Sequence, residues 1–184
     1  MNDNHIILIG HRSSGKTRIF QRLSETNSFI THPSPTDKIE QTVIHISGKD
    51  YHLYDTPGTK TPILIPILQK ATLILLVYES THHYAYHNIS TWLEFISHYT
   101  TAPIILVSDQ IDFLTNTQKR LQLSFFSEWV KKQIWVDSIR GRHLSAIHDA
   151  ITEYNTPLPI PITIQTPIIH DDPGCFYLCP LRWW

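Results

Sequence analysis

Short apolar segments rich in β-branched residues alternate with longer segments of helical periodicity up to residue 154. The segments that predict strands are Ile6–Ile9, Gln41–Ser47, Tyr51–Tyr54, Thr72–Tyr78, Ile104–Val107 and Ile134–Val136. Those that predict helices are Lys16–Leu23, His87–Tyr99, Thr115–Val130 and Leu144–Tyr154. Strands separated by such helices imply crossover connections and a parallel sheet covered on both faces.

The second and third strands are the exception, because only Gly48-Lys49-Asp50 joins them. So short a link is typical of a hairpin, and we expect this pair to be antiparallel. The predicted fold class is therefore α/β, a doubly wound, mostly parallel six-stranded sheet with one antiparallel edge strand.

The composition changes after Tyr154. Residues 155–184 hold half of the 12 prolines, and they end in a segment that carries Cys175, Cys179 and Trp183-Trp184. Proline at this density is incompatible with a helix or a central strand. We predict one domain over 1–154 and a C-terminal extension over 155–184, whose cysteines serve packing, acylation or, with His170, a metal site.

Charge and composition narrow the function classes. The 184 residues include 15 Lys+Arg and 16 Asp+Glu, which gives a net charge of −1. So small a charge argues against non-specific electrostatic binding to nucleic acid or anionic lipid. The longest apolar stretch, Ala71–Tyr78, is far shorter than a membrane span. Two cysteines near the C-terminus make no disulfide framework. We expect a cytoplasmic protein that reaches a membrane only through a partner or its tail.

The first predicted strand leads into a phosphate-loop motif, G-x4-G-K-[ST]. Glycines in such a loop allow successive backbone N–H groups to point inward at a phosphate, and the following helix N-terminus adds partial positive charge. Lys16 is expected to reach the β- and γ-phosphates, and the Thr17 hydroxyl a Mg²⁺ position. The predicted phosphate-binding residues are Gly10, His11, Arg12, Ser13, Ser14, Gly15, Lys16 and Thr17.

The third strand ends in Asp55-Thr56-Pro57-Gly58, a D-x-x-G motif. Its carboxylate is suited to hold Mg²⁺ through water, and the Gly58 N–H to approach the γ-phosphate. In the proline-rich loop before it, Thr36 is the candidate that places a hydroxyl on Mg²⁺, with Thr31 as the alternative. The predicted magnesium residues are Thr17, Thr36 and Asp55, and the predicted catalytic residues are Lys16, Thr36 and Gly58.

The fifth strand leads into Ser108-Asp109-Gln110-Ile111-Asp112. Guanine-binding GTPases carry [NT]-K-x-D at this place, and Asp112 suits the role of its last aspartate, which accepts from guanine. Asp109 replaces the usual Asn and Gln110 the usual Lys. Ser138 and Ile139 follow the sixth strand, where the S-A-K loop belongs. We predict a degenerate guanine pocket built from these residues.

These motifs resemble those of the Ras-like small GTPases over residues 5–154. Within that superfamily, Ser14–Thr17, Ser34–Asp37 and Asp55–Gly58 look most like the β-subunit of the signal recognition particle receptor. The resemblance implies a small G-domain that binds GTP or GDP with Mg²⁺ and acts as a switch or a nucleotide-holding subunit in protein targeting. Its partner would be a receptor α-like subunit or an effector that contacts the switch loops, at the cytosolic face of the endoplasmic reticulum or another endomembrane. An Arf- or Rab-like trafficking GTPase, or a degenerate binding subunit, is the alternative.

Two residues bear on hydrolysis. In Ras-like families the residue after D-x-x-G is usually the glutamine that orients the attacking water, and here it is Thr59, whose side chain is shorter. Arg12 adds bulk inside the phosphate loop and either obstructs or imitates a partner's arginine, unless it is simply solvated. The resemblance therefore implies slow intrinsic GTP hydrolysis.

Overall fold

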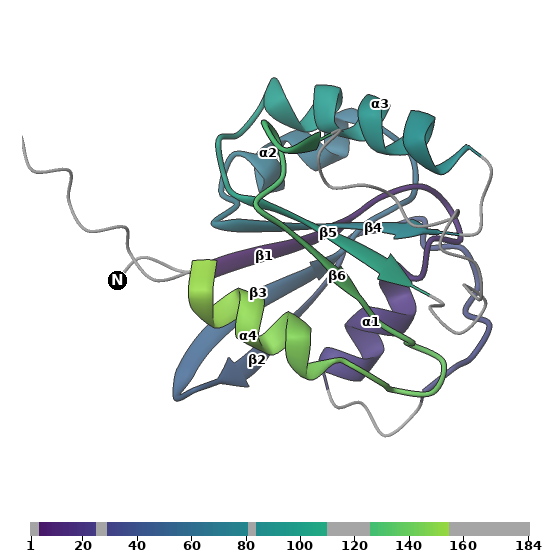
Figure 1. Ribbon diagram of the computed structural model, residues 1–184, viewed down its shortest axis with the longest axis vertical. Helices are drawn as coiled ribbons and strands as arrows, with labels where there is room; N and C mark the ends of the chain where they lie inside the picture. Colours follow the sequence, from purple (N-terminus) through teal and green to yellow (C-terminus); the bar gives the residue numbers. More distant parts are fainter. Residues whose placement is uncertain (1–3, 25–28, 81–83, 110–125, 155–184) are drawn as a thin grey trace, which may run out of the picture.

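Within the described residues of the computed structural model, six strands form one sheet in the order β2-β3-β1-β4-β5-β6 (Figure 1). The model describes residues 4–24, 29–80, 84–109 and 126–154. The strands are β1 (Asn4–Ile9), β2 (Glu40–Ile46), β3 (Lys49–Asp55), β4 (Leu73–Glu79), β5 (Ile104–Asp109) and β6 (Lys132–Trp135). Strand β2 is antiparallel to β3, and every other pairing is parallel. The predicted fold class is confirmed.

The β2–β3 hairpin turns at Ser47-Gly48, one residue earlier than the predicted link. Both residues have positive φ, 52° and 75°. A two-residue turn with this backbone follows the right-handed twist of the strands. Lys49 and Asp50 therefore belong to β3 and pair with Ile46 and His45 of β2. The link predicted over Gly48-Lys49-Asp50 was therefore wrong in its bounds.

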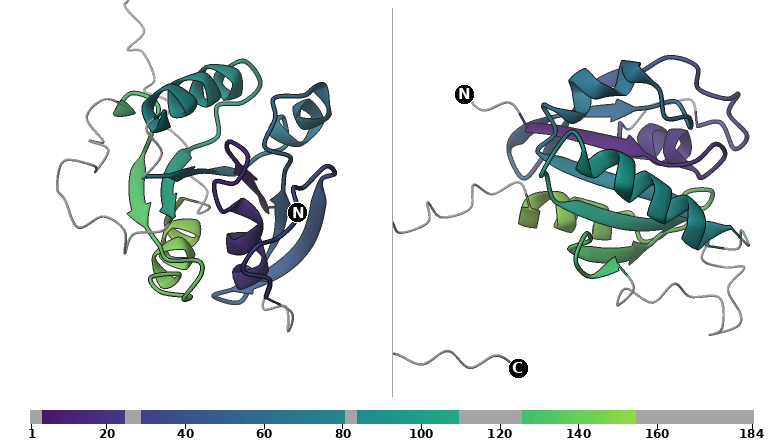
Figure 2. Two further views of the ribbon diagram at one scale, coloured as in Figure 1. Left: turned by 90° about the vertical axis from the view of Figure 1, so that its right-hand side faces the viewer. Right: turned by 90° about the horizontal axis from the view of Figure 1, so that it is seen from above.

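Helices cover both faces of the sheet, as the views along two directions show (Figure 2). Helices α1 (Lys16–Leu23) and α4 (Ser145–Tyr154) lie on one face. The other face carries α2 (Ile65–Leu68), which follows the short 3₁₀ turn η1 (Pro62–Leu64), and α3 (Ala85–Ser97).

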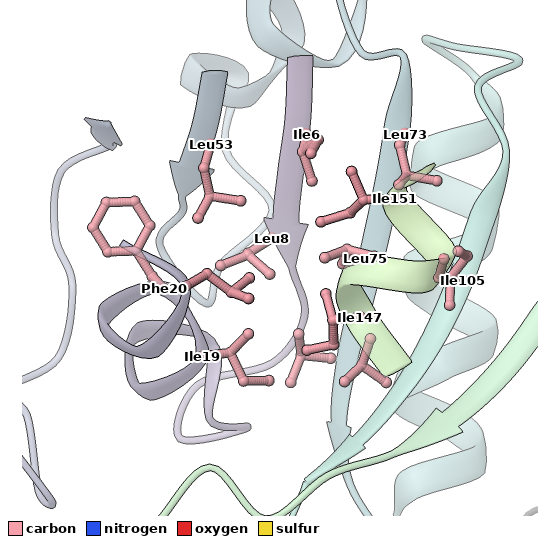
Figure 3. Packing of buried hydrophobic residues seen from close by; sticks show 14 of the residues in the cluster. Ile6, Leu8, Ile19, Phe20, Leu53, Leu73, Leu75, Ile105, Ile147 and Ile151 are labelled. Carbon is pink, nitrogen blue, oxygen red and sulfur yellow. The ribbon is translucent and has the colours of Figure 1, made fainter. Parts of the chain in front are cut away.

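The larger core cluster lies between the sheet and the first pair of helices (Figure 3). Ile19 of α1 and Ile147 of α4 pack toward Leu8 and Leu75 on the two central strands, and all four side chains are fully buried. Strands β1 and β4 are apolar on both faces because both faces are covered, the pattern of a parallel sheet. This packing fixes the ends of β1, β3 and β5, from which the candidate site is built.

The helices differ from the prediction at two places. Residues 126–130, the end of the helix predicted over Thr115–Val130, form a turn in which the N–H groups of Trp129 and Val130 both donate to the Phe126 carbonyl. The rest of that prediction lies outside the described residues, as does the extension over 155–184. Helix α2 was not predicted; Pro66 lies in its first turn, where a missing N–H has no cost.

Ile147→Ala tests the role of α4 in this core. Because the Ile147 side chain has no exposed surface, its truncation leaves a cavity and is expected to lower the free energy of unfolding by about 2–5 kcal/mol. Urea unfolding followed by circular dichroism measures the change. Ile63→Ala is the matched control, since Ile63 is 55% exposed, and its effect is expected to stay within about 0.5 kcal/mol. Equal losses for both variants would contradict this assignment of the core.

Candidate phosphate and magnesium site

The parallel topology brings three motif-bearing segments to one edge of the sheet. Strand β1 ends directly before the phosphate loop, β3 ends at Asp55, and β5 ends at Asp109. In the register of the sheet, Leu8 pairs with Asp55 and Glu79 with Asp109, so these strands end at similar heights. The carboxyl edge of such a sheet is where α/β proteins bind their ligands.

A cavity of about 220 Å³ opens at this edge. It is lined by the phosphate loop, by the loop before β2 and by the segment after β3. The lining residues are Arg12, Ser13, Ser14, Gly15, Lys16, Thr17, Arg18, His32, Pro33, Ser34, Pro35, Thr36, Thr56 and Gly58. Most of the predicted phosphate residues therefore face one cavity together with Thr36 and Gly58, whereas Gly10, His11 and Asp55 lie outside its lining.

Lys16 is a buried cation at the start of α1. Its Nζ donates to the His11 carbonyl at 2.7 Å and lies 3.5 Å from Ser14 Oγ. Burial lowers the pKa of Lys16 to about 8, against the opposing effect of the nearby Asp55 carboxylate. A phosphate placed in the cavity would compensate this cation for the solvation that burial has removed, as in an anion-binding site.

The first turn of α1 adds to this positive field. Gly15 is its N-cap, and no acidic residue lies in the turn to neutralise the partial charge of the free N–H groups. Gly15 has φ +101°, and a Cβ there would lie 2.2 Å from Asp109 Oδ2. Glycine is therefore needed both for the backbone conformation and for the close approach of β5 to the loop.

The D-x-x-G segment also packs directly on the phosphate loop. A Cβ added at Gly58 would lie 2.4 Å from the Arg12 backbone nitrogen. The buried Thr56 hydroxyl donates to the Leu8 carbonyl at 2.7 Å, which ties this segment to the end of β1. The Gly58 backbone is thereby held beside the loop, as a contact to a terminal phosphate requires.

Thr17, Thr36 and Asp55 converge from three separate segments. The Thr17 hydroxyl donates to Asp55 Oδ2 at 2.6 Å and lies 2.9 Å from the Thr36 hydroxyl, which itself is 3.2 Å from the same oxygen. Burial raises the pKa of Asp55, while the hydroxyl bonds and Lys16 act in the opposite direction. The alternative threonine, Thr31, is exposed.

This trio suits a magnesium ion. Asp55 Oδ1 is buried and has no hydrogen-bond partner within the described parts of the chain, so a hard acceptor is left available. Mg²⁺ is commonly held by one carboxylate together with hydroxyls, waters and substrate phosphates. No group of three or more His, Cys, Asp or Glu side chains in the described ranges is arranged to hold a metal by itself. The donor set therefore fits a metal that arrives with a phosphate ligand.

The predicted base-recognition residues have a different environment. Asp109 is fully buried and accepts from the Ser138 N–H, the Ser138 hydroxyl and the Arg18 guanidinium. Ile139 contributes a carbonyl that accepts from Arg22 Nη2 at 2.6 Å. Gln110 and Asp112 lie outside the described residues.

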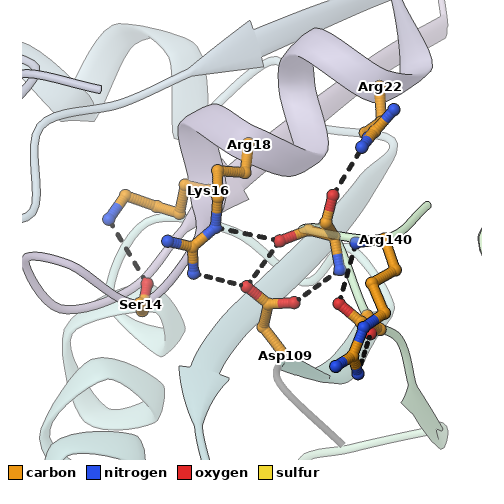
Figure 4. Close-up of polar contacts among 8 residues, drawn as sticks. Ser14, Lys16, Arg18, Arg22, Asp109 and Arg140 are labelled. Carbon is orange, nitrogen blue, oxygen red and sulfur yellow. Dashed lines mark hydrogen bonds and ion pairs between the residues drawn. The ribbon is translucent and has the colours of Figure 1, made fainter. Parts of the chain in front are cut away.

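Arg18 and Arg22 are the two site residues that sequence reasoning missed (Figure 4). Arg22 Nε donates to the Ser138 carbonyl at 2.9 Å, so both arginines hold the loop after β6. Their spacing of four residues places them on one face of α1. Two arginines four residues apart, directly after a phosphate loop, could have suggested that both belong to the site. The sequence did not show that their partners would be Asp109 and the Ser138 loop.

Comparison with known proteins identifies the family to which this chain belongs. Residues 5–138 match the model of the Ras family. The chain belongs to the Ras family. Ras-family proteins are small GTPases that in general bind GTP or GDP with Mg²⁺, hydrolyse GTP and interact with effectors and regulators. The narrower likeness to the signal recognition particle receptor β-subunit has no support in this match, and no curated protein matches the chain.

The match ends at residue 138, so the predicted domain boundary at 154 stays a prediction. Among the described residues, no helix is both long and apolar enough to cross a membrane.

Thr36→Ala tests whether Thr36 helps Thr17 and Asp55 to hold Mg²⁺ in this site. Loss of the hydroxyl beside Asp55 is expected to raise the Mg²⁺ concentration needed for half-maximal GTP retention by at least about tenfold. Release of a fluorescent GTP analogue during Mg²⁺ titration measures it. Thr31→Ala removes the same group from an exposed position of the same loop and is expected to have no effect. A larger effect from Thr31→Ala than from Thr36→Ala would contradict the assignment.

Proposed function

We propose that this chain binds GTP or GDP with Mg²⁺ and acts as a molecular switch whose intrinsic hydrolysis is slow. The observation that carries the proposal is the cavity in which Lys16, the free N–H groups of α1 and the Gly58 segment surround one space large enough for phosphates. In that cavity Lys16 would contact the β- and γ-phosphates, and the backbone of Gly10 to Thr17 would surround them.

Magnesium would be held by Thr17, Thr36 and, through water, Asp55. The ion would neutralise phosphate charge and orient the phosphate chain. Thr36 lies in the loop before β2, whereas Asp55 is held at the end of β3. Their contact with a common ligand therefore offers a way to order that loop when triphosphate is present. A partner protein that recognises the ordered loop would then distinguish the two nucleotide states.

Slow hydrolysis follows from the residues next to Gly58. Thr59 is exposed, and its hydroxyl is too short to position a water as a glutamine would. Arg12 lies against Gly58 at the mouth of the cavity. An arginine here occupies space that a partner's arginine would otherwise need.

The second candidate is a nucleotide-holding subunit of a larger assembly, which binds GTP without a hydrolytic cycle. Thr59 and the internally bonded Asp109 favour it. A place in protein targeting beside a receptor α-like subunit, at the cytosolic face of an endomembrane, is the specific form of this candidate that the sequence motifs suggest. A trafficking role of the Arf or Rab kind is the corresponding form of the switch.

Mass analysis of nucleotide released from denatured protein tests nucleotide binding. We expect GDP or GTP, and we expect Lys16→Ala to abolish its retention, because the buried ammonium is the main cationic partner in the cavity. Lys49→Ala, at the exposed hairpin, is the matched control and is expected to leave retention unchanged. Protein that stays empty with Mg²⁺ and excess GTP would refute the proposal.

Single-turnover hydrolysis of [γ-³²P]GTP tests the role of Thr59. The natural chain is expected to be slow, and Thr59→Gln combined with Arg12→Gly is expected to accelerate it on the order of tenfold or more, because the glutamine amide can orient water. Thr59→Val, of similar volume, is the control and is expected to remain slow. Fast turnover by the natural chain without a partner would refute this part of the proposal.

A further inference from the structure

The end of β5 carries a buried, closed polar cluster, which we call the Arg18 cluster: Arg18, Asp109 and Ser138. Arg18 Nη2 lies 2.7 Å from Asp109 Oδ2, and the two side chains are 9% and 0% exposed. Arg18 Nε donates to Ser138 Oγ at 3.0 Å, and Ser138 Oγ donates to Asp109 Oδ2 at 2.7 Å. The Ser138 N–H donates to the other carboxylate oxygen at 2.9 Å (Figure 4).

The members of this cluster satisfy one another. Both donors of Ser138 are directed at Asp109, and the carboxylate accepts three hydrogen bonds, one of them from a cation. A ligand that sought hydrogen bonds here would first have to break charge-assisted bonds in a buried place, which is costly. Lys16 differs from Arg18, although both line the cavity. The Arg18 guanidinium is bonded to the Asp109 carboxylate, whereas Lys16 Nζ is bonded, among the described residues, only to the His11 carbonyl and Ser14 Oγ.

The Asp109 carboxylate lies beside the phosphate loop and is paired with Arg18. Its Oδ2 lies so close to Gly15 that a Cβ there would be only 2.2 Å away. A carboxylate at this distance from the loop would repel a bound phosphate unless a cation neutralised it. Arg18 supplies that cation and remains paired with Asp109 for the same reason.

From this geometry we propose that the Arg18 cluster closes the base side of the site, so that the protein retains nucleotides by their phosphates with little discrimination between bases. The inference rests on the proposed nucleotide binding and deepens it by defining the ligand class as nucleoside di- and triphosphates with various bases. Guanine and adenine differ at ring position 6, an acceptor in guanine and a donor in adenine. Distinguishing them requires polar groups that are available to the base, and the two described residues at this place, Asp109 and Ser138, use theirs within the cluster. Arg18 is a positioning residue here, since it acts through Asp109.

Competition binding on the full chain with Mg²⁺ tests the proposal, with GDP, ADP and UDP each displacing a fluorescent GDP analogue. A site that reads the base by hydrogen bonds discriminates by far more than about 30-fold. We expect the three dissociation constants of the natural chain to lie within about 30-fold of one another. A wider spread in favour of GDP would overturn the proposal, and would point to residues 110–112 as the base contact.

The double variant Arg18→Ala with Asp109→Asn removes both charges together and therefore avoids leaving one of them buried and unpaired. It removes the guanidinium and replaces one carboxylate oxygen with an amide NH₂ that can donate to guanine, so the ratio of the ADP to the GDP dissociation constant is expected to rise by at least about tenfold. Arg18→Gln with Asp109→Asn keeps more side-chain volume and serves if the first variant fails to fold in a thermal unfolding assay. Lys132→Ala, in the exposed ion pair with Glu153, is the control with an unchanged ratio.

A ratio that stays unchanged in a folded double variant would overturn the role assigned to Arg18. Failure of the proposed function has a different signature, because GDP, ADP and UDP would then all fail to bind the natural chain at millimolar concentration. A merely structural role of Arg18 would change the three dissociation constants in parallel and leave the ratio where it was, which also counts against the proposal.

Discussion

Two cations lie buried in the first turn of α1, and the need to pair them determines the arrangement of the site. A buried charge is tolerated only with a partner and hydrogen bonds. Arg18 meets this need permanently, with the Asp109 carboxylate at the end of β5. Lys16 meets it only in part, with the His11 carbonyl and Ser14, and burial depresses its pKa. The helix start therefore has one side that remains attractive to an anion and one side that is already neutralised.

The sheet makes this asymmetry possible. Strands β1, β4 and β5 are covered on both faces, and β3 pairs with β1. Their packing places the phosphate loop, Asp55 and Asp109 at one edge of the sheet. The short polar segments that follow the strands need little structure of their own, because the core holds their ends.

Much of this could be predicted from the sequence, because the signals are local. Periodicity and turn residues predict the parallel sheet and the antiparallel edge, and the spacing of Lys16, Thr36 and Asp55 predicts which segments meet. The helix end at residues 126–130 was predicted wrongly, since apolar spacing alone does not distinguish a helix from a turn packed on the core. The short helix α2 was missed because Pro62, just before it, and Pro66, within it, count against a helix in any pattern.

The sequence by itself therefore determined the fold class, the phosphate loop and the loss of the usual water-positioning glutamine. Each of these depends on residues that are neighbours in the sequence. Only the tertiary structure decided what Arg18 and Asp109 do. They are 91 residues apart, and each alone looks like an ordinary polar substitution in a nucleotide site. Their pairing depends on the distance between α1 and the end of β5, which the packing of the whole core sets. That pairing joins two residues that look unrelated in the sequence into one closed cluster.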